Sequence, residues 1–354
     1  MKTASGTDQA IAAYKPMVSI IIVNWNGGKY LEAAVSSALQ QTYTPLEVLV
    51  VDNGSTDDSL SILNVKFGVR ITVLSQTKNH GFSEGVNIGL RSARGQYIAL
   101  LNNDAFADPN WISAMAHAMT YHPRVGMCAC KVLFYYSPTV IDKVGHLMYP
   151  DGLNVGRGLG EQDNGQYDQT EEALFPDGSA ALYRREVFEE AGLFDAQFFA
   201  YGDDADFGMR ARWLGWDCRY VPTAVVHHVH SATFGRYSPQ KAFLVERNRL
   251  WLAVKVFPAR LLLASPYYTL VRFCWQAYAA LSGRGSSGQF AQAHSRAALI
   301  RTLFRAYGSA LRGLPAILQK RSAVFRARKV TSRDFIALLR RYRATARELA
   351  LRER

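Results

Sequence analysis

Two apolar, β-branched runs decide the fold: Val18-Ser-Ile-Ile-Ile-Val-Asn24 and Leu46-Glu-Val-Leu-Val-Val-Asp52. The interval between them, from about residue 30 to 41, is predicted to be helical, so the chain opens as a β-α-β unit. Strands at about 70–74 and 96–101, separated by a helix at about 83–93, continue the alternation. This order predicts an open α/β sheet with parallel strands and helices on both faces.

Polar side chains stand at three of these strand ends, as Asn24, Asp52 and Asn102-Asn103-Asp104. Ligands of open α/β sheets bind beyond the carboxyl ends of the strands, so we expect these side chains to gather at one edge. Asp104 supplies the oxygen ligand that a hard cation bridging two phosphates requires. Taken alone, Asn-Asn-Asp is also an ordinary turn before the helix expected after Pro109.

A glycine-rich segment, Asn79-His80-Gly81-Phe82 with Gly85, Asn87 and Gly89, follows the third predicted strand. It resembles a phosphate-binding loop, although its spacing does not match G-x-G-x-x-G, so the signal is weak.

Three carboxylates fall within four residues in Asp203-Asp204-Ala205-Asp206. Like charges this close raise at least one carboxyl pKa, which suits a general base. The alternative is a helix N-terminus that carries surplus acid. His227-His228-Val229-His230 ends a later β-branched run, and a neutral imidazole is a common metal ligand, although a hydrogen-bonded structural role remains the alternative for His228.

The motifs Val18-Ser-Ile-Ile-Ile-Val-Asn-Trp-Asn-Gly27, Val51-Asp-Asn-Gly-Ser-Thr-Asp57 and Leu101-Asn-Asn-Asp104, in this order, resemble glycosyltransferase family 2, which has the GT-A fold. The segment 178–206 is similar to the rhamnosyltransferase-like members of that family. The resemblance covers about residues 17 to 257.

The resemblance implies a role for several residues. Asp52 would hold the nucleotide base, Trp25 would line the base and ribose site, Asp104 would bind the metal, and Asp204 would be the catalytic base. With the glycine-rich segment, the expected nucleotide-sugar-binding residues are Trp25, Asp52, Asn53, Gly81, Asn87, Asn102, Asn103 and Asp104. The expected acceptor-side residues are Asp177, Gly178, Ser179 and Asp203.

The sequence departs from the family pattern at the metal motif, because Asn102-Asn103-Asp104 keeps only one firm carboxylate of the usual D-x-D. A second contact to Mg²⁺ or Mn²⁺ would then fall to His228. The segment 151–177, rich in Gly, Asn, Asp and Gln, is expected to be a long connection or lid beside the site.

The formal charge of +12 is unevenly placed, because residues 255–354 hold 20 Lys or Arg against 3 Asp or Glu. Residues 261–281 contain Pro266 and Arg272, so an amphipathic helix in the plane of an anionic membrane is favoured over a span. On that helix Ser265, Thr269, Arg272 and Gln276 form the expected polar face, opposite an apolar face. Packing on the catalytic domain is the alternative, and no nucleic-acid-binding signature is present.

These features predict a flexible tail at 1–16, a GT-A catalytic domain at 17–257 and a basic, membrane-associating helical region at 258–354. The N-terminus lacks a signal peptide's apolar core, and four cysteines without a C-x-x-C pair indicate a reducing compartment. We expect an inverting, non-processive glycosyltransferase on the cytoplasmic face of the inner membrane. It would move rhamnose or another deoxysugar from a dTDP- or UDP-linked donor to a glycan or lipid-linked acceptor.

Two other functions stay open at this point. A processive polysaccharide synthase would carry Gln-x-x-Arg-Trp, but Arg210-Ala-Arg-Trp213 lacks the Gln. A catalytically idle membrane adaptor with the same fold is favoured only by the reduced metal motif.

Overall fold

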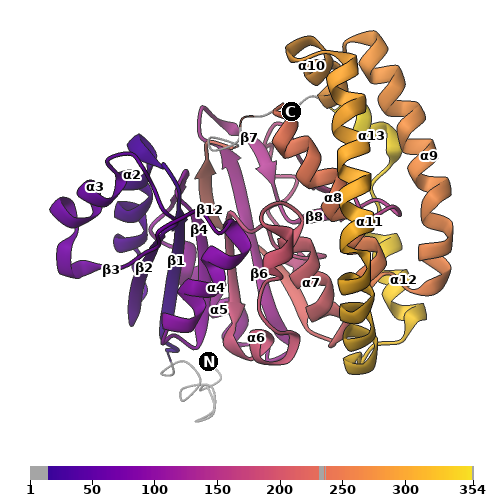
Figure 1. Ribbon diagram of the computed structural model, residues 1–354. Coiled ribbons are helices and arrows are strands. Elements are labelled where there is room, and N and C mark those ends of the chain that lie inside the picture. Colours follow the sequence, from indigo (N-terminus) through magenta and orange to yellow (C-terminus); the bar gives the residue numbers. More distant parts are fainter. Residues whose placement is uncertain (1–14, 231–234, 236, 353–354) are drawn as a thin grey trace.

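The computed structural model describes residues 15–230, 235 and 237–352, and Figure 1 shows its two layers, a sheet flanked by helices and a C-terminal group of helices. The tail expected at 1–16 lies, except for its last two residues, outside the described part. Within the described residues, none of the helices combines the length and the hydropathy that a membrane span requires.

The first half of the chain alternates strands and helices, as the sequence predicts. Its parallel strands are β1 (Val18–Asn24), β2 (Leu46–Asp52), β3 (Thr72–Ser75) and β4 (Tyr97–Asn102). Its helices are α2 (Gly28–Leu39), α3 (Ser59–Lys66), α4 (Phe82–Ser92) and α5 (Trp111–Thr120).

The strands that follow β4 extend this sheet to the order β10-β12-β6-β11-β4-β1-β2-β3, with β5 on β12 and β7 on β6. β11 runs antiparallel to both β4 and β6, so the sheet is mixed. The added strands are β5 (Ala105–Ala107), β6 (Val125–Phe134), β7 (Ser137–Lys143), β10 (Glu171–Glu172), β11 (Ala180–Arg184) and β12 (Asp217–His228). A separate hairpin joins β8 (His146–Met148) to β9 (Asn154–Gly156).

Both faces of the central strands are buried, which explains why β1 and β2 read as continuous apolar runs. Ile20 and Ile22 of β1 pack with Leu31 and Val35 of α2, whereas Ile21 packs on the opposite face with Val86 of α4. The sheet therefore holds its strand ends rigidly, and the polar residues that follow them are well positioned.

Helices make up most of the remainder of the chain. They are α6 (Arg185–Ala191), α7 (Asp203–Trp213), α8 (Pro239–Val256), α9 (Ala259–Ser282), α10 (Gly285–Ala293), α11 (Arg296–Ala327), α12 (Ser332–Arg341) and α13 (Ala346–Leu351). The C-terminal group shares a core with the sheet domain, because the ring of Phe335 stacks on Trp213 at a centroid distance of 3.9 Å.

Helix α9 is amphipathic with the polar face expected from the sequence, but that face points inward. Arg272 is fully buried and its guanidinium bonds Asp151 and Glu246, at 2.7 Å each. The apolar positions are exposed instead, and Leu263 has 82% of its surface open to solvent. The polar stripe therefore joins α9 to the rest of the molecule.

Candidate active site

A cavity of about 300 Å³ opens beyond the carboxyl ends of β1 and β4. This volume is at the lower end of the range of small-molecule sites. Twelve of the residues expected from the sequence line it: Trp25, Asn53, Gly81, Asn102, Asn103, Asp104, Asp177, Gly178, Ser179, Asp203, Asp204 and His228. The two others, Asp52 and Asn87, do not.

Asp52 lies beneath the cavity and is fully buried. Its carboxylate accepts hydrogen bonds from Asn24 Nδ2 at 2.9 Å and from the Ser55 backbone N–H at 3.2 Å. Asn24 in turn accepts a bond from Asn103 Nδ2 at 2.9 Å. Asp52 thus supports the neighbouring strand ends. It does not line the cavity, although the resemblance implied that it would contact the nucleotide base there.

Asn87 is also displaced from its expected place, because its side chain is used within the protein. Its Nδ2 donates to the Phe194 carbonyl at 2.9 Å, and its Oδ1 accepts from the Phe194 N–H at 3.0 Å. This pair of bonds ties α4 to the chain that leads to η2 (Ala196–Phe198). Asn87 is therefore a structural residue, which the glycine-rich pattern around it could not reveal.

Asn53 and Gly81 fix the conformation of the glycine-rich turn before the N-terminus of α4. Asn53 Nδ2 donates to the Gly81 carbonyl at 3.0 Å, and the His80 N–H donates to Asn53 Oδ1 at 3.0 Å. Gly81 has φ +86°, and a Cβ there would lie 2.5 Å from the Phe199 carbonyl oxygen. Only glycine fits this turn.

On one wall of the cavity, Asp104 and His228 face each other across 3.2 Å, measured from Oδ1 to Nε2. The backbone fixes this pairing, because His228 is the antiparallel partner of Ala105 and the Val229 N–H donates to the Asp104 carbonyl at 3.0 Å. The side chains of Asp104 and His228 are nearly buried. The imidazole Nε2 has no hydrogen-bond partner within the described chain, although it points at a carboxylate.

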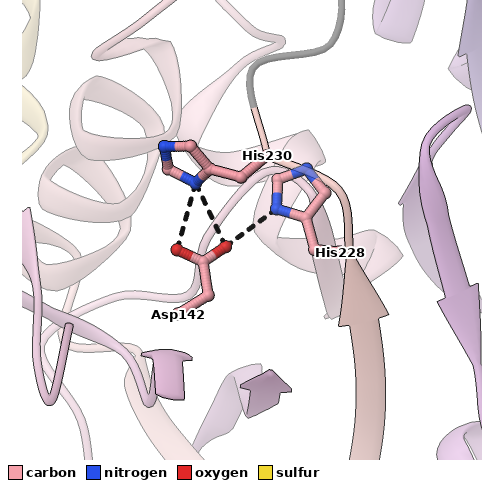
Figure 2. Close-up of side chains that lie close together, drawn as sticks. All are labelled: Asp142, His228 and His230. Atoms are coloured by element: carbon pink, nitrogen blue, oxygen red, sulfur yellow. Dashed lines mark hydrogen bonds and ion pairs between the residues drawn. The ribbon is translucent and has the colours of Figure 1, made fainter. Parts of the chain in front are cut away.

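A second carboxylate, Asp142 of β7, contacts the rings of both His228 and His230, as Figure 2 shows. Its Oδ2 lies 2.8 Å from His228 Nδ1, and its Oδ1 lies 3.1 Å from His230 Nδ1. Asp142 is fully buried. The Lys143 ammonium, 3.5 Å from Asp142, compensates its charge.

The two histidines respond differently to these neighbours. Burial alone would lower both pKa values, but Asp104 and Asp142 outweigh it at His228 and raise its pKa to about 9. At His230 burial prevails and lowers the pKa to about 4. His228 is thus a strongly basic imidazole whose Nε2 attracts a positive charge, and a divalent cation with Asp104 fits that demand.

On the opposite wall, Asp203 and Asp204 begin α7. Asp203 Oδ2 accepts from the Ser83 hydroxyl at 2.9 Å, and Asp204 Oδ2 accepts from the Gly178 N–H at 3.3 Å. Burial and the charge of Asp204 raise the pKa of Asp203 to about 7. Burial also raises the pKa of Asp204, against the opposing effect of His146.

Asp177, Lys143 and His146 connect the two walls. Asp177 Oδ2 lies 3.0 Å from both Lys143 Nζ and His146 Nε2, and that same Nε2 lies 3.8 Å from Asp204. Lys143 and His146 hold the pKa of Asp177 well below its usual range despite its burial. Asp177 is therefore an ionised carboxylate that positions the Lys143 ammonium and the His146 imidazole.

Sequence reasoning missed Asp142 and Lys143, which end β7, and His146, which begins β8. The available signal was Val140-Ile-Asp-Lys-Val144, where adjacent opposite charges interrupt an apolar strand. Charges in such a run are stable only when paired, so they mark a buried polar site. No motif, however, shows which site they would reach.

Comparison with known proteins gives the same family as the motifs. The sequence profile of glycosyl transferase family 2 matches residues 19–192. An uncharacterised glycosyltransferase of Haemophilus influenzae is 26% identical over 245 residues, which cover 66% of this chain and 73% of that protein. The UDP-Glc:alpha-D-GlcNAc-diphosphoundecaprenol beta-1,3-glucosyltransferase WfaP of Escherichia coli is 34% identical over 144 residues, or 40% of this chain and 54% of WfaP.

Among solved structures, the mannosyltransferase PcManGT of Pyrobaculum calidifontis, in complex with GDP-Man and Mn²⁺, has a TM-score of 0.51 at 19% identity. The match covers 89% of this chain and 86% of PcManGT, and at this identity it shows the fold alone. The profile identifies residues 19–192 as a glycosyl transferase family 2 domain, its sheet topology is that of the GT-A fold, and with its relatives this domain makes the protein a glycosyltransferase.

Proposed function

We propose that the protein is an inverting, non-processive, metal-dependent transferase that moves a sugar from a nucleotide diphosphate to a growing cell-surface glycan or its lipid-linked precursor. The observation that carries this proposal is the pairing of two walls in one cavity: Asp104 with His228 on one side and Asp203 with Asp204 on the other. The first wall suits the cation of a diphosphate, and the second suits the removal of a proton.

Asp104 and His228 would hold Mg²⁺ or Mn²⁺, which offsets the charge that builds on the leaving diphosphate. The 3.2 Å approach of His228 Nε2 to Asp104 Oδ1 supports this assignment, because a buried nitrogen this close to a carboxylate requires a cation or a proton between them. The relative PcManGT binds Mn²⁺ on the same fold.

Asp204 is the proposed base. It takes the proton of the acceptor hydroxyl as that oxygen forms a bond to the anomeric carbon, while the bond from this carbon to the diphosphate oxygen breaks. Asp203, with its pKa raised to about 7, holds the proton of the pair below neutral pH, which leaves Asp204 as the carboxylate that can accept a proton. A single displacement of this kind inverts the anomeric configuration.

Transfer of one residue at a time is supported by the segment Arg210 to Trp213, which corresponds to the motif of processive enzymes. Its side chains serve the core: Arg210 bonds Asp206 at 2.9 Å, and Trp213 Nε1 donates to the Val256 carbonyl at 2.8 Å. None of these residues lines the cavity.

The donor sugar is proposed from the resemblance of residues 178–206 to rhamnosyltransferases, which favours rhamnose or another deoxyhexose on dTDP or UDP. A lipid-linked acceptor is supported by WfaP, whose name specifies a diphosphoundecaprenol substrate. The turn Asp177-Gly178-Ser179 lies beside Asp204 and is the proposed acceptor-side wall.

The test is transfer measured over a panel of dTDP-, UDP- and GDP-sugars with Mn²⁺ or Mg²⁺, using the wild type and Asp204→Asn. We expect one donor class to be used, and the variant to lose ~10²- to 10⁴-fold in kcat with donor affinity kept. Equal turnover in the variant would remove Asp204 from the mechanism, and turnover without a divalent cation would remove the metal.

We further propose that the C-terminal helices bring the enzyme to the cytoplasmic face of the inner membrane, where a lipid-linked acceptor would lie. Exposed apolar side chains on α9 and α11 support this, together with exposed arginines on α11. The apolar side chains are Leu263, Tyr267, Leu270, Tyr278 and Leu281 on α9 and Ile300, Phe304, Leu311 and Leu318 on α11. Arg301, Arg305 and Arg312 would contact anionic headgroups.

Flotation with phosphatidylglycerol vesicles tests this placement. We expect the full-length protein to float with anionic vesicles, less so in high salt, and the double variant Leu263→Ser with Phe304→Ser to remain in the soluble fraction. Equal flotation of the variant would show that these side chains do not contact lipid.

A further inference from the structure

Asp142 is the buried carboxylate nearest to the proposed metal side of the cavity, and the transfer mechanism does not use it. It is fully buried and lies 2.8 Å from His228 Nδ1 and 3.1 Å from His230 Nδ1 (Figure 2). A buried carboxylate is costly unless it is paired and hydrogen-bonded, and Asp142 meets both conditions through Lys143 and the two histidines. The question is what this one provides.

The geometry fixes which nitrogen of His228 carries a proton. A carboxylate accepts hydrogen bonds, so an imidazole nitrogen 2.8 Å from Asp142 must be the protonated one. The other nitrogen, Nε2, lies 3.2 Å from Asp104 Oδ1. When a cation displaces the proton between these two atoms, Nδ1 keeps its proton on Asp142 and Nε2 presents its lone pair to the cavity. Without Asp142, either tautomer and several ring rotations would be available to His228.

The backbone alone does not determine this orientation. β12 pairs His228 with Phe134 on one side and with Ala105 on the other, which fixes the Cα but not the rotation of the ring. Asp142 reaches the ring from β7, two strands away from β12 in the sheet path. The contact therefore joins segments that the motif around His228 does not contain.

We propose that Asp142 is a positioning residue that holds the His228 ring with Nε2 toward Asp104, and so supplies what the reduced Asn102-Asn103-Asp104 motif has lost. This inference rests on the proposed metal-dependent function and deepens it. A carboxylate behind a metal-binding imidazole also increases the basicity of the ligand. The Asp104 carboxylate and the oriented His228 imidazole would then bind the cation that the two carboxylates of a D-x-D motif bind.

Asp142, His228 and His230 offer an alternative cation site, because each places a ligand atom within 4.8 Å of the others. A cation held among these three would bind His228 through Nδ1. Two features oppose it: the distance from Asp142 to His228 Nδ1 is that of a hydrogen bond, and the Lys143 ammonium already lies 3.5 Å from Asp142. The test must distinguish Nε2 from Nδ1.

The first experiment measures Mn²⁺ binding to the full-length protein directly, from the electron paramagnetic resonance signal of free Mn²⁺, with and without UDP. We expect Asp142→Asn, which keeps the side-chain volume, to weaken Mn²⁺ binding by ~10- to 100-fold. Asp163→Asn is the matched control, because it removes a carboxylate paired with Lys131, at 2.8 Å, that does not line the cavity. It should bind Mn²⁺ like the wild type.

The second experiment needs no variant, so misfolding of Asp142→Asn cannot obscure it. In wild-type protein with ¹⁵N-labelled histidine and ¹¹³Cd²⁺ in place of Mn²⁺, we expect the His228 signal to show a proton on Nδ1 and coupling of cadmium to Nε2. Coupling through Nδ1, or unchanged Mn²⁺ affinity in a folded Asp142→Asn, would overturn the inference and leave the transferase function intact. A wild type that binds neither ion, with or without UDP, would refute the metal requirement itself.

Discussion

Asp203 and Asp204 are neighbours in sequence but occupy different surroundings. Asp203 is held by the Ser83 hydroxyl and is nearly buried, whereas Asp204 lies by the Gly178 N–H and 3.8 Å from His146. Burial and like charge raise the pKa of Asp203 to about 7, so Asp203 is the member that keeps the proton. Asp204 is left ionised, as a base must be.

This arrangement predicts a step in the pH profile of turnover. As pH rises through about 7, Asp203 loses its proton, and its new negative charge raises the pKa of Asp204 and makes it a stronger base. We expect wild-type kcat to rise between pH 6 and 8 at saturating metal and donor. In Asp203→Asn the second charge cannot form, so kcat should be flat over the same range.

Two results check the assignment of that step. The melting temperature of Asp203→Asn at pH 8 should exceed that of the wild type, because a neutral amide replaces a buried carboxylate that is costly to ionise. If instead the step near pH 7 persists in the folded variant, another group causes it and the pair does not share the proton as described.

Helix α8 holds the segment that precedes α7, a role that its sequence pattern does not indicate. Asn248 of α8 donates through Nδ2 to three carbonyls of the segment before α7: Phe198 at 2.9 Å, Ala200 at 2.8 Å and Tyr201 at 2.7 Å. Phe199 and Tyr201 have positive φ values, of 68° and 66°. Non-glycine residues adopt this conformation only when their surroundings enforce it, and the Asn248 amide is one of the groups that restrain this segment.

We therefore expect Asn248→Ala to reduce kcat more than it reduces donor affinity. The loop from Phe198 to Gly202 leads directly into Asp203 and Asp204, and loss of its restraint would misplace the base; a displacement of ~1 Å costs on the order of 10²-fold in rate. Transfer kinetics with metal and donor varied separately would show this. A proportional fall in donor binding, with kcat kept, would mean that Asn248 serves the donor site instead.

At this same scale, the limits of sequence reasoning become clear. The strands predicted at 18–24 and 46–52 coincide with β1 and β2, because buried parallel strands give an unmistakable run of apolar residues. The topology alone predicts that Asn102, Asn103 and Asp104 lie at the edge where the ligand binds. It does not predict the contribution of β7, because Asp142 contacts His228 through strand pairings between distant segments, which no local sequence pattern encodes.

For the molecule as a whole, the inward polar face of α9 is one of the links between the C-terminal helices and the rest of the chain. Arg272 is fully buried between Asp151 and Glu246, and Arg249 lies 2.7 Å from the same glutamate. Replacing Arg272 by Ala leaves two acids with too little positive charge. We expect the variant to lose ~3 to 5 kcal/mol of unfolding free energy in urea denaturation.

Arg312→Ala is the control, since this arginine of α11 is exposed, and its effect should stay within ~0.5 kcal/mol. The pairing also shows what periodicity leaves open for this helix, since the sequence predicts its two faces but not which of them packs on the catalytic domain. Periodicity gives the two sides of a helix, whereas the side that turns inward depends on whether the remaining chain offers acids or apolar residues. Here it offers Asp151 and Glu246.

The reversed polarity of α9 also changes which substitutions natural variation can tolerate. Along most helices of a globular protein, the apolar positions are constrained by folding and the polar ones drift. On α9, folding constrains Arg272, while Leu263, Tyr267 and Leu270 are exposed and free to become polar at little cost to stability. If homologous sequences keep apolar residues at those three positions, the reason is contact with a partner surface and not the stability of the fold.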